Sequence, residues 1–182
     1  MSAKPTLANP PLRIFGLDPG LAHTGWGVLE QSGSRLRAIA YGCVVTGPET
    51  EISLRLHQIF SEVSAAIERY AAREFAIETV YHKGNDRSAI ATAEARGAAL
   101  VAAGEAGLKV GEYAPAKIKS AVCGNGRADK RQVQFMVARL LGLQQEIKPD
   151  HCADALAAAI CHAHLRHAHD LLEPPQPSAG PH

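Results

Sequence analysis

Cysteine is scarce in this chain of 182 residues, and its spacing excludes two common kinds of small protein. The four cysteines, Cys43, Cys123, Cys152 and Cys161, form no CxxC pair and show no paired spacing suited to zinc. We therefore expect them to be reduced residues in or beside the core. Neither a disulfide framework nor a zinc module is predicted.

Long apolar runs and an excess of one charge are also missing. No stretch approaches the roughly 20 residues of a membrane helix, and residues 1–11 lack the apolar segment of an export signal. We therefore expect a cytoplasmic protein with no membrane partner. The formal net charge of +1 does not by itself identify a nucleic-acid-binding protein, so such a function must rest on local charge.

The apolar patterns predict one α/β domain over residues 12–169, between a disordered leader (1–11) and a disordered proline-rich tail (170–182). Three strands with short connections form an antiparallel meander, and two shorter strands then alternate with helices. The strands are expected at residues 12–18, 24–30, 36–45, 74–79 and 108–113, and the helices at 51–70, 86–104, 115–122, 129–141 and 150–169. This order predicts a mixed sheet flanked by helices.

The segment from Arg13 to Gly27, R-I-F-G-L-D-P-G-L-A-H-T-G-W-G, carries the first chemical signal. Its apolar strand ends on Asp18, directly before a Pro-Gly turn. A carboxylate at the end of a buried strand is costly unless a cation meets it, and a divalent metal is the simplest such cation. An Asp that only shapes the turn is an equally good interpretation of this motif alone.

Further carboxylates follow the same placement. Glu78 ends a second apolar strand, and the last helix begins D-H-C-A-D-A-L-A-A-A, with His151 and Asp154 three residues apart on one face. For that helix alone, an N-cap at Asp150 and a solvated Asp154 are the simpler interpretation. Taken together, oxygen ligands with one imidazole suit Mg²⁺ or Mn²⁺. Two such ions about 4 Å apart can support phosphodiester hydrolysis.

Several independent motifs resemble one family in order and spacing. They are F-G-L-D-P-G, T-G-W-G-V, F-A-I-E-T-V-Y, A-R-G-A-A-L, Y-A-P-A-K-I-K and H-C-A-D-A-L-A, and the resemblance runs from about Ile14 to Leu165. The chain is similar to the RuvC family of bacterial Holliday-junction resolvases. The resemblance implies a ribonuclease-H-like fold, with three antiparallel strands and then two parallel ones. It also implies a homodimer that makes paired, symmetric nicks in four-way DNA junctions during recombination and repair.

The resemblance also implies roles for four residues. Asp18 resembles the first-strand ligand that bridges two Mg²⁺ or Mn²⁺ ions, Glu78 the second ligand and Asp154 the last-helix carboxylate. His151 falls where family members have Asp or His, so the site here has one fewer negative charge than in some relatives. Asp150 is disfavoured as a substitute ligand, because one residue lies about 100° further round a helix.

DNA contacts are expected in the middle of the chain. Between Tyr81 and Arg131 there are nine Lys and Arg residues against five Asp and Glu. Lys119 and Lys130 match basic positions that the family places by the scissile strand, and Tyr81 matches an aromatic that stacks on an unpaired base. Weaker candidates for phosphate contacts are Lys83, Arg87 and Lys117. Each of these charges could instead be an ordinary solvated side chain, and Tyr81 a half-buried one.

Some partners and roles stay open at this stage. The Ala-rich helix over residues 88–104 lacks a wide polar face, which suits close packing on a second copy or on the rest of the monomer. A branch-migration motor of the RuvA and RuvB type is implied by the resemblance alone. His162, His164, His167 and His169 form no metal motif and are expected at the surface. The alternatives are a nuclease of the same superfamily that acts on RNA and a catalytically silent junction-binding dimer. A two-domain ATPase is disfavoured, because this chain supplies one domain.

Overall fold

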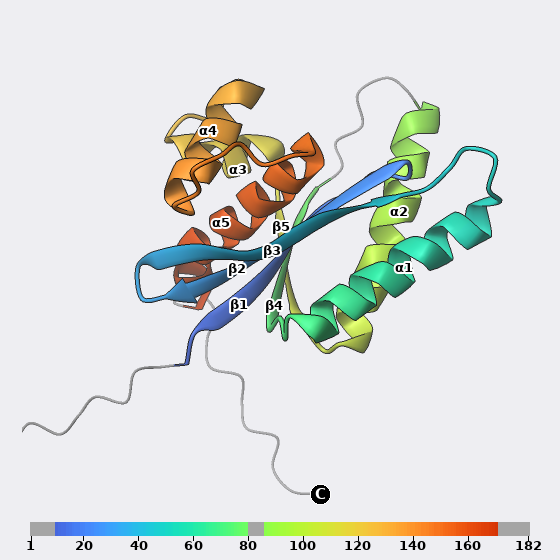
Figure 1. Ribbon diagram of the computed structural model, residues 1–182, viewed down its shortest axis with the longest axis horizontal. Coiled ribbons are helices and arrows are strands. Elements are labelled where there is room, and N and C mark those ends of the chain that lie inside the picture. The colour runs from blue at the N-terminus through green and yellow to red at the C-terminus, as the bar shows by residue number, and fades with distance from the viewer. Residues whose placement is uncertain (1–9, 80–85, 171–182) are drawn as a thin grey trace, which may run out of the picture.

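The computed structural model describes residues 10–79 and 86–170, which form a sheet between two layers of helices (Figure 1). The strands are β1 (Leu12–Asp18), β2 (His23–Ser32), β3 (Arg35–Val45), β4 (Glu74–Glu78) and β5 (Lys109–Tyr113). The helices are α1 (Ile52–Arg69), α2 (Asp86–Glu105), α3 (Pro115–Cys123), α4 (Lys130–Leu140) and α5 (Asp150–Asp170). The expected elements are confirmed, with ends that differ by one or two residues.

The sheet has the order β3-β2-β1-β4-β5. Strands β1, β2 and β3 pair antiparallel, whereas β4 pairs parallel with β1, and β5 parallel with β4. This is the predicted sheet of three antiparallel and two parallel strands. Strand β1 is central and covered on both faces, which explains why Ile14, Phe15 and Leu17 are all fully buried.

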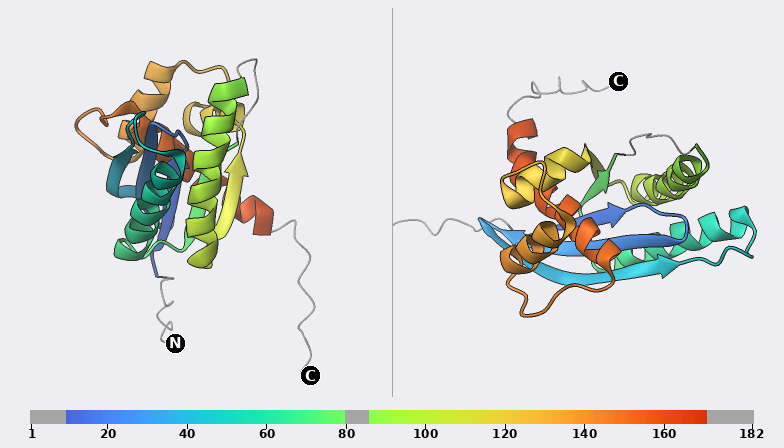
Figure 2. Two further views of the ribbon diagram at one scale, coloured as in Figure 1. Left: turned by 90° about the vertical axis from the view of Figure 1, so that its right-hand side faces the viewer. Right: turned by 90° about the horizontal axis from the view of Figure 1, so that it is seen from above.

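The two faces of the sheet carry separate cores. One face packs Phe15 and Phe75 against helices α1 and α2, with the two rings stacked at a centroid distance of 5.4 Å. The other face packs against α5, with α3 and α4 outside it. Figure 2 shows α1 and α2 side by side on their face of the sheet.

Helix α5 lies directly on the sheet because both surfaces carry very small residues. A Cβ atom on Gly16 of β1 would stand 2.0 Å from the carbonyl oxygen of Ala155, and one on Gly25 of β2 would stand 2.1 Å from that of His151. Only glycine permits this approach of backbone to backbone. The start of α5 is thereby held against the end of β1.

Several secondary expectations are tested by this structure. The four cysteines are free, with Cys152 and Cys161 buried and Cys43 and Cys123 partly buried, as predicted. No helix in the described part of the chain is long and apolar enough to span a membrane. The leader up to residue 9 and the tail from residue 171 lie outside the described residues, so their predicted disorder stays a prediction.

The surface position expected for His162 is wrong. Its residue is only 3% exposed, and both of its ring nitrogens have partners: Nδ1 lies 2.7 Å from the Tyr113 hydroxyl and Nε2 lies 2.6 Å from Glu74 Oε2. A hydrogen-bonded partner at each nitrogen compensates for the loss of hydration when the imidazole is buried. His164 is exposed as predicted, and the side chains of His167 and His169 lie outside the described residues.

Candidate active site

The ends of three elements bring the predicted ligands to one edge of the sheet. Asp18 is the last residue of β1 and Glu78 the last residue of β4, and the two strands run parallel with Leu17 opposite Ile77. The next residues, Asp18 and Glu78, therefore end neighbouring strands at the same edge. Helix α5 begins at Asp150, so His151 and Asp154 lie in its first turns above this edge.

Asp18, His151 and Asp154 form a compact group of side chains that could hold a metal ion. One ligand atom from each lies within 4.8 Å of the others, and all three residues are half-buried. The Nδ1 atom of His151 lies 2.8 Å from Oδ2 of Asp18. Two carboxylates and an imidazole around one point form a donor set that fits a divalent cation such as Mg²⁺ or Mn²⁺.

Glu78 is not part of that compact group, but it lines the same groove. The groove has a volume of about 340 Å³, and its lining consists of Asp18, Glu78, Pro115, Ile118, Lys119, Lys130, Val133, Asp154 and Ala157. The lining of the groove thus includes three carboxylates and two lysines, one from α3 and one from α4. Such a lining suits a phosphate bound through cations.

Two carboxyl groups of this groove, Asp18 and Glu78, have raised pKa values. Burial raises the pKa of Asp18, and the nearby charge of Asp154 adds to this effect, although the hydrogen bond from His151 opposes it. Burial, together with the charges of Asp18 and Asp154, raises the pKa of Glu78 to about 7. A bound cation would stabilise the ionised form of these carboxyl groups, which burial and mutual repulsion make unfavourable.

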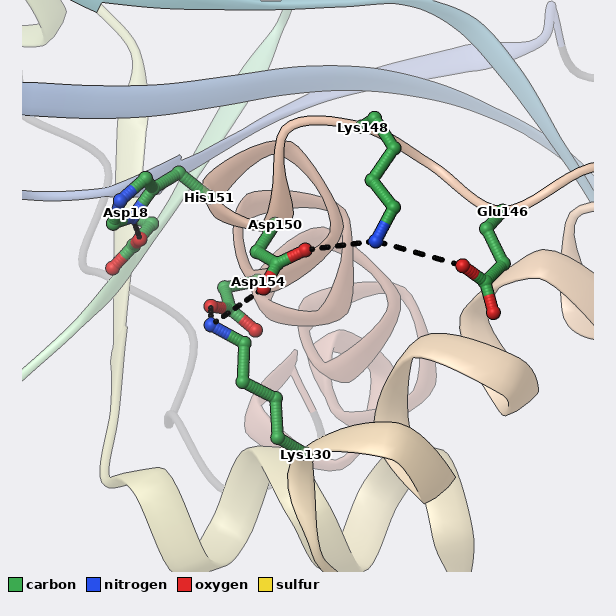
Figure 3. A network of polar contacts seen from close by, with 7 residues as sticks. All are labelled: Asp18, Lys130, Glu146, Lys148, Asp150, His151 and Asp154. Carbon is green, nitrogen blue, oxygen red and sulfur yellow. Dashed lines mark hydrogen bonds and ion pairs between the residues drawn. The ribbon is translucent and has the colours of Figure 1, made fainter.

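Lys130 places a positive charge beside Asp154 of the groove and beside Asp150, and Figure 3 shows both ion pairs. Its Nζ atom lies 3.4 Å from Oδ2 of Asp154 and 3.4 Å from Oδ2 of Asp150. Burial opposes the charge of Lys130, but the two carboxylates outweigh it and raise the pKa of the ammonium group. Asp150 also pairs with Lys148 and points away from the Asp18–His151 pair (Figure 3), and it is not part of the compact group.

The predicted DNA-binding residues do not all lie at this groove. Lys119 and Lys130 line it, and the charge of Lys119 acts on Glu78. Lys117 is exposed on α3 and does not line the groove, because two residues along a helix correspond to about 200° of rotation. Arg87 is exposed in the first turn of α2, and Tyr81 and Lys83 lie outside the described residues.

A second polar cluster was missed by the sequence reasoning. Glu74, at the start of β4, accepts hydrogen bonds from Nε and Nη2 of Arg166 at 2.9 and 2.6 Å, and it also contacts His162. The helical spacing carries a signal for this cluster. His162 follows His151 by eleven residues, so the two lie within about 20° of each other on α5, on the face turned to the sheet.

A sheet of this order, with acids at the ends of two adjacent strands and His151 and Asp154 at the start of the last helix, places the chain among proteins of the ribonuclease-H-like fold, with side chains that could hold a metal ion at the sheet edge. Residues 14–162 match the family described as crossover junction endodeoxyribonuclease RuvC. The chain belongs to the RuvC family. It is 43% identical over 169 residues to the RuvC of Syntrophomonas wolfei, covering 93% of this chain and 98% of that protein. It is 51% identical over 156 residues to the RuvC of Hyphomonas neptunium, covering 85% and 92%.

Solved structures agree with this assignment. Thermus thermophilus RuvC matches with a TM-score of 0.80 at 35% identity, over 87% of this chain and 97% of that one. The same protein in complex with a Holliday junction substrate matches with a TM-score of 0.81 at 34% identity, over 86% and 96%. The yeast mitochondrial resolvase Ydc2 shares the fold, with a TM-score of 0.58 at 12% identity over 90% of this chain and 86% of that one.

Proposed function

We propose that this chain resolves four-way DNA junctions by metal-dependent hydrolysis of phosphodiester bonds at the groove between β1, β4 and α5. One observation carries the proposal: Asp18, His151 and Asp154 gather ligand atoms within 4.8 Å, in a groove that Glu78 and two lysines complete. Membership of the RuvC family supplies the substrate class. The reaction would leave 5′-phosphate and 3′-hydroxyl ends.

The ligands suit two Mg²⁺ or Mn²⁺ ions. Asp18, His151 and Asp154 would hold one ion, and Glu78 with Asp18 would hold the other, because both carboxylates face the same groove. When bound, such ions activate water and neutralise charge on the leaving oxygen. The imidazole of His151 favours Mn²⁺ somewhat more than an all-oxygen site would.

The chain's own cations would orient the substrate. Lys119 and Lys130 stand at the sides of the groove, where their ammonium groups can bind the phosphate that is cut and its neighbour. Arg87, Lys117, Lys83 and Tyr81 are proposed to contact DNA further from the reacting bond. Phosphate contacts of this kind position a strand without reading its sequence.

A second copy of the chain is proposed to dock on α2. Ala95, Ala99 and Ala102 of this helix are buried in the core that it shares with α1. The opposite face exposes Ile90 and Val101, with Glu94 and Gly97 between them at helical spacing. Exposed apolar side chains around a glycine suit close helix packing, and a two-fold dimer would present two sites to the two strands of a junction.

Further partners rest on family membership. A branch-migration motor of the RuvA and RuvB type is proposed to deliver the junction, and an enzyme acting on chromosomal junctions is proposed to work in the cytoplasm. The alternatives of an RNA nuclease and a silent junction-binding dimer are not favoured. Every predicted ligand position holds a residue able to coordinate a metal, and the relatives are named as junction endodeoxyribonucleases.

A cleavage assay tests this function directly. A synthetic four-way junction and linear duplexes of the same arm sequences would be incubated with the protein and with Mg²⁺, Mn²⁺ or EDTA. We expect symmetric nicks in the junction with either metal, none with EDTA and none in the duplexes. Junction binding without cleavage under every metal would contradict the catalytic assignment. Cleavage of an RNA–DNA hybrid in preference to the junction would replace the substrate class.

A further inference from the structure

The ammonium group of Lys130 occupies an unusual position. It lies 3.4 Å from Asp154, a member of the candidate metal-binding group, and 3.4 Å from Asp150, which stands outside that group. A single cation thus bridges the ligand set and its rim (Figure 3). In the protein without metal, this ammonium group partly neutralises the carboxylate of Asp154, which a divalent ion would otherwise neutralise.

Helix stability does not account for a lysine at this position. Lys130 is the first residue of α4, where the helix dipole disfavours a positive charge. The start of α4 is held instead by a capping box, in which the Asp129 side chain accepts from the Gln132 backbone and the Gln132 side chain accepts from the Asp129 backbone. The backbone of Lys130 is therefore anchored, while its long side chain is free to turn between partners.

The contact with Asp154 is weak enough to exchange. Strong ammonium–carboxylate hydrogen bonds measure about 2.7–2.9 Å, and both Lys130 contacts are longer, at 3.4 Å. The Lys130 side chain is also 53% exposed. Ion pairs of this kind break readily when a divalent ion competes for one of the carboxylates.

Asp150 provides a second carboxylate that a metal ion would leave untouched. It lies outside the compact ligand group, and Lys148 holds it from the other side, at 3.4 Å, while pairing with Glu146 at 3.5 Å. The chain Glu146–Lys148–Asp150–Lys130–Asp154 alternates in charge along its whole length. Loss of the Asp154 contact would still leave the ammonium with a partner at the edge of the groove.

We propose that Lys130 is a placeholder cation and that Asp150 is its positioning residue. Without metal, the ammonium neutralises Asp154. When the ligand group takes up a metal ion, the ammonium leaves Asp154 and is retained by Asp150 at the side of the groove, where it reaches a DNA phosphate. The proposal rests on the proposed function for the metal site and adds an exchange of cations at Asp154.

Metal binding to the DNA-free protein tests the exchange. Mn²⁺ would be titrated into the full-length wild type and Lys130→Gln by calorimetry at one ionic strength. The variant lacks the competing ammonium, so we expect it to bind Mn²⁺ about fivefold more tightly, which corresponds to ~1 kcal/mol. The same variant should cleave junctions more slowly, because it has lost a phosphate contact.

Two matched variants separate exchange from general charge. Lys119→Gln removes the other lysine of the groove, and Lys148→Gln removes a lysine that pairs with Asp150. Lys148→Gln should change Mn²⁺ affinity by less than about twofold, because Lys148 pairs outside the ligand group. Lys119→Gln removes a charge that acts on Glu78, so it should raise the affinity, but by less than Lys130→Gln does, since Lys130 lies on Asp154. Equal gains in affinity for Lys119→Gln and Lys130→Gln would overturn the placeholder role.

The positioning role of Asp150 has its own readout. Asp150→Asn should lower kcat about tenfold with little change in KM, and should add little to the effect of Lys130→Gln in the double variant. Restoration of kcat by Asp150→Glu would support a charge-dependent contact, whereas additive effects would contradict retention by Asp150. A wild type that binds no Mn²⁺ and cuts no junction would refute the proposed function itself, an outcome distinct from all of these.

Discussion

Asp18, a proposed ligand, ends the central strand of the sheet, and its Oδ2 atom lies 2.8 Å from Nδ1 of His151. Asp18→Asn keeps the size of the side chain but removes the charge that holds a cation. We expect cleavage of a four-way junction to fall about 10³-fold or more. Junction binding, measured by gel shift in Ca²⁺ or EDTA, should stay within about twofold, because the lysines of the groove remain.

The matched control is Cys152→Ser, a buried position next to His151 that contributes no ligand to the group. It should keep cleavage while it lowers stability. Wild-type cleavage by Asp18→Asn would refute the ligand assignment, and loss of binding would show that Asp18 acts through the DNA-binding surface.

Glu78 makes metal binding depend on pH. Burial and neighbouring charges raise the pKa of Glu78 to about 7 in the metal-free protein. Below that pH the carboxyl group is mostly protonated, and it must lose its proton to bind a cation. We expect Mn²⁺ affinity to fall by about tenfold per unit of pH below about 7. Calorimetric titrations at several pH values should show this slope in the wild type and a slope smaller by about one proton in Glu78→Gln.

The raised pKa of Glu78 also lowers the stability of the folded protein at high pH. Because the pKa of Glu78 in the folded protein exceeds the ordinary value of 4.5, its charged form costs folding free energy above about pH 7. The cost disappears as the pH falls toward 4.5. A metal-free protein whose Glu78→Gln variant gains no stability at pH 8 would contradict the raised pKa.

The sequence was enough to place the proposed ligands at one edge of the sheet, but not to predict the contacts among the charged side chains. Asp18, Glu78 and Asp154 each end a strand or begin a helix, which places them at one edge of the sheet. Nothing in the spacing showed that Lys130 would reach both Asp150 and Asp154, since α4 and α5 are joined by a loop whose path depends on packing. The structure also shows that Lys117 lies off the groove.

Helix α5 carries two of the proposed ligands, His151 and Asp154, and its distance from the sheet depends on Gly16. A Cβ at this position would stand 2.0 Å from the carbonyl oxygen of Ala155 and 2.9 Å from the Cβ of Ala159, so Gly16→Ala must displace the helix. We expect a loss of about 3 kcal/mol of unfolding free energy and a fall in Tm of about 10 °C. Differential scanning calorimetry would measure both, with Mn²⁺ affinity as a second readout below the Tm.

Gly104→Ala is the control for this change. Nothing lies within 4 Å of a Cβ at Gly104 on α2, and alanine is the better helix former. Its Tm should stay the same or rise slightly. Unchanged metal affinity in Gly16→Ala would show that the ligands tolerate a shift of α5.

Glu74 anchors the far end of α5 to β4. Its hydrogen bonds with His162 and Arg166 outweigh the effect of burial and lower the pKa of Glu74 to about 2. A lowered pKa contributes stability above about pH 4.5, and this contribution is lost as the pH falls toward 2. Glu74→Gln should cost about 3 kcal/mol at pH 7, because it removes the carboxylate charge that contacts His162 and Arg166.

Urea denaturation across pH would measure the effect of Glu74→Gln. The difference from the wild type should narrow as the pH falls below 4.5 toward 2. Glu112→Gln removes an exposed ion pair with Arg96 and should cost less than about 1 kcal/mol. A Glu74→Gln difference that stays constant with pH would refute the charged network.

The elements themselves follow closely from local patterns, and the buried network does not. Apolar strand patterns and helical spacing gave the order and nearly the bounds of every described element, because each pattern reflects which faces of the element are buried. His162 was assigned to the surface because it forms no metal motif with the neighbouring histidines. Its burial depends on Glu74 and Tyr113, which lie in strands 88 and 49 residues away in the chain. Such long-range pairing is not visible in one helix.

The two helical layers of the molecule lie on opposite faces of the sheet, with α3, α4 and α5 on one face and α1 and α2 on the other (Figure 1). Residues of α3, α4 and α5 line the groove, whereas Ile90 and Val101 are exposed on α2. A two-fold axis through α2 would therefore join two copies without covering either groove. This arrangement allows one active site for each of two strands in a junction.

A charge on the exposed face of α2 should prevent dimerisation, so that junctions are nicked in one strand but not cut in both strands together. Val101 is 55% exposed on α2, and Val101→Glu places a charge where the second copy would pack. We expect a monomer by light scattering, with metal affinity unchanged and junctions nicked in one strand at a time. Phe135→Glu, at an equally exposed position on α4, should leave the dimer intact. If Val101→Glu stays dimeric and cuts both strands together, the interface lies elsewhere on the molecule.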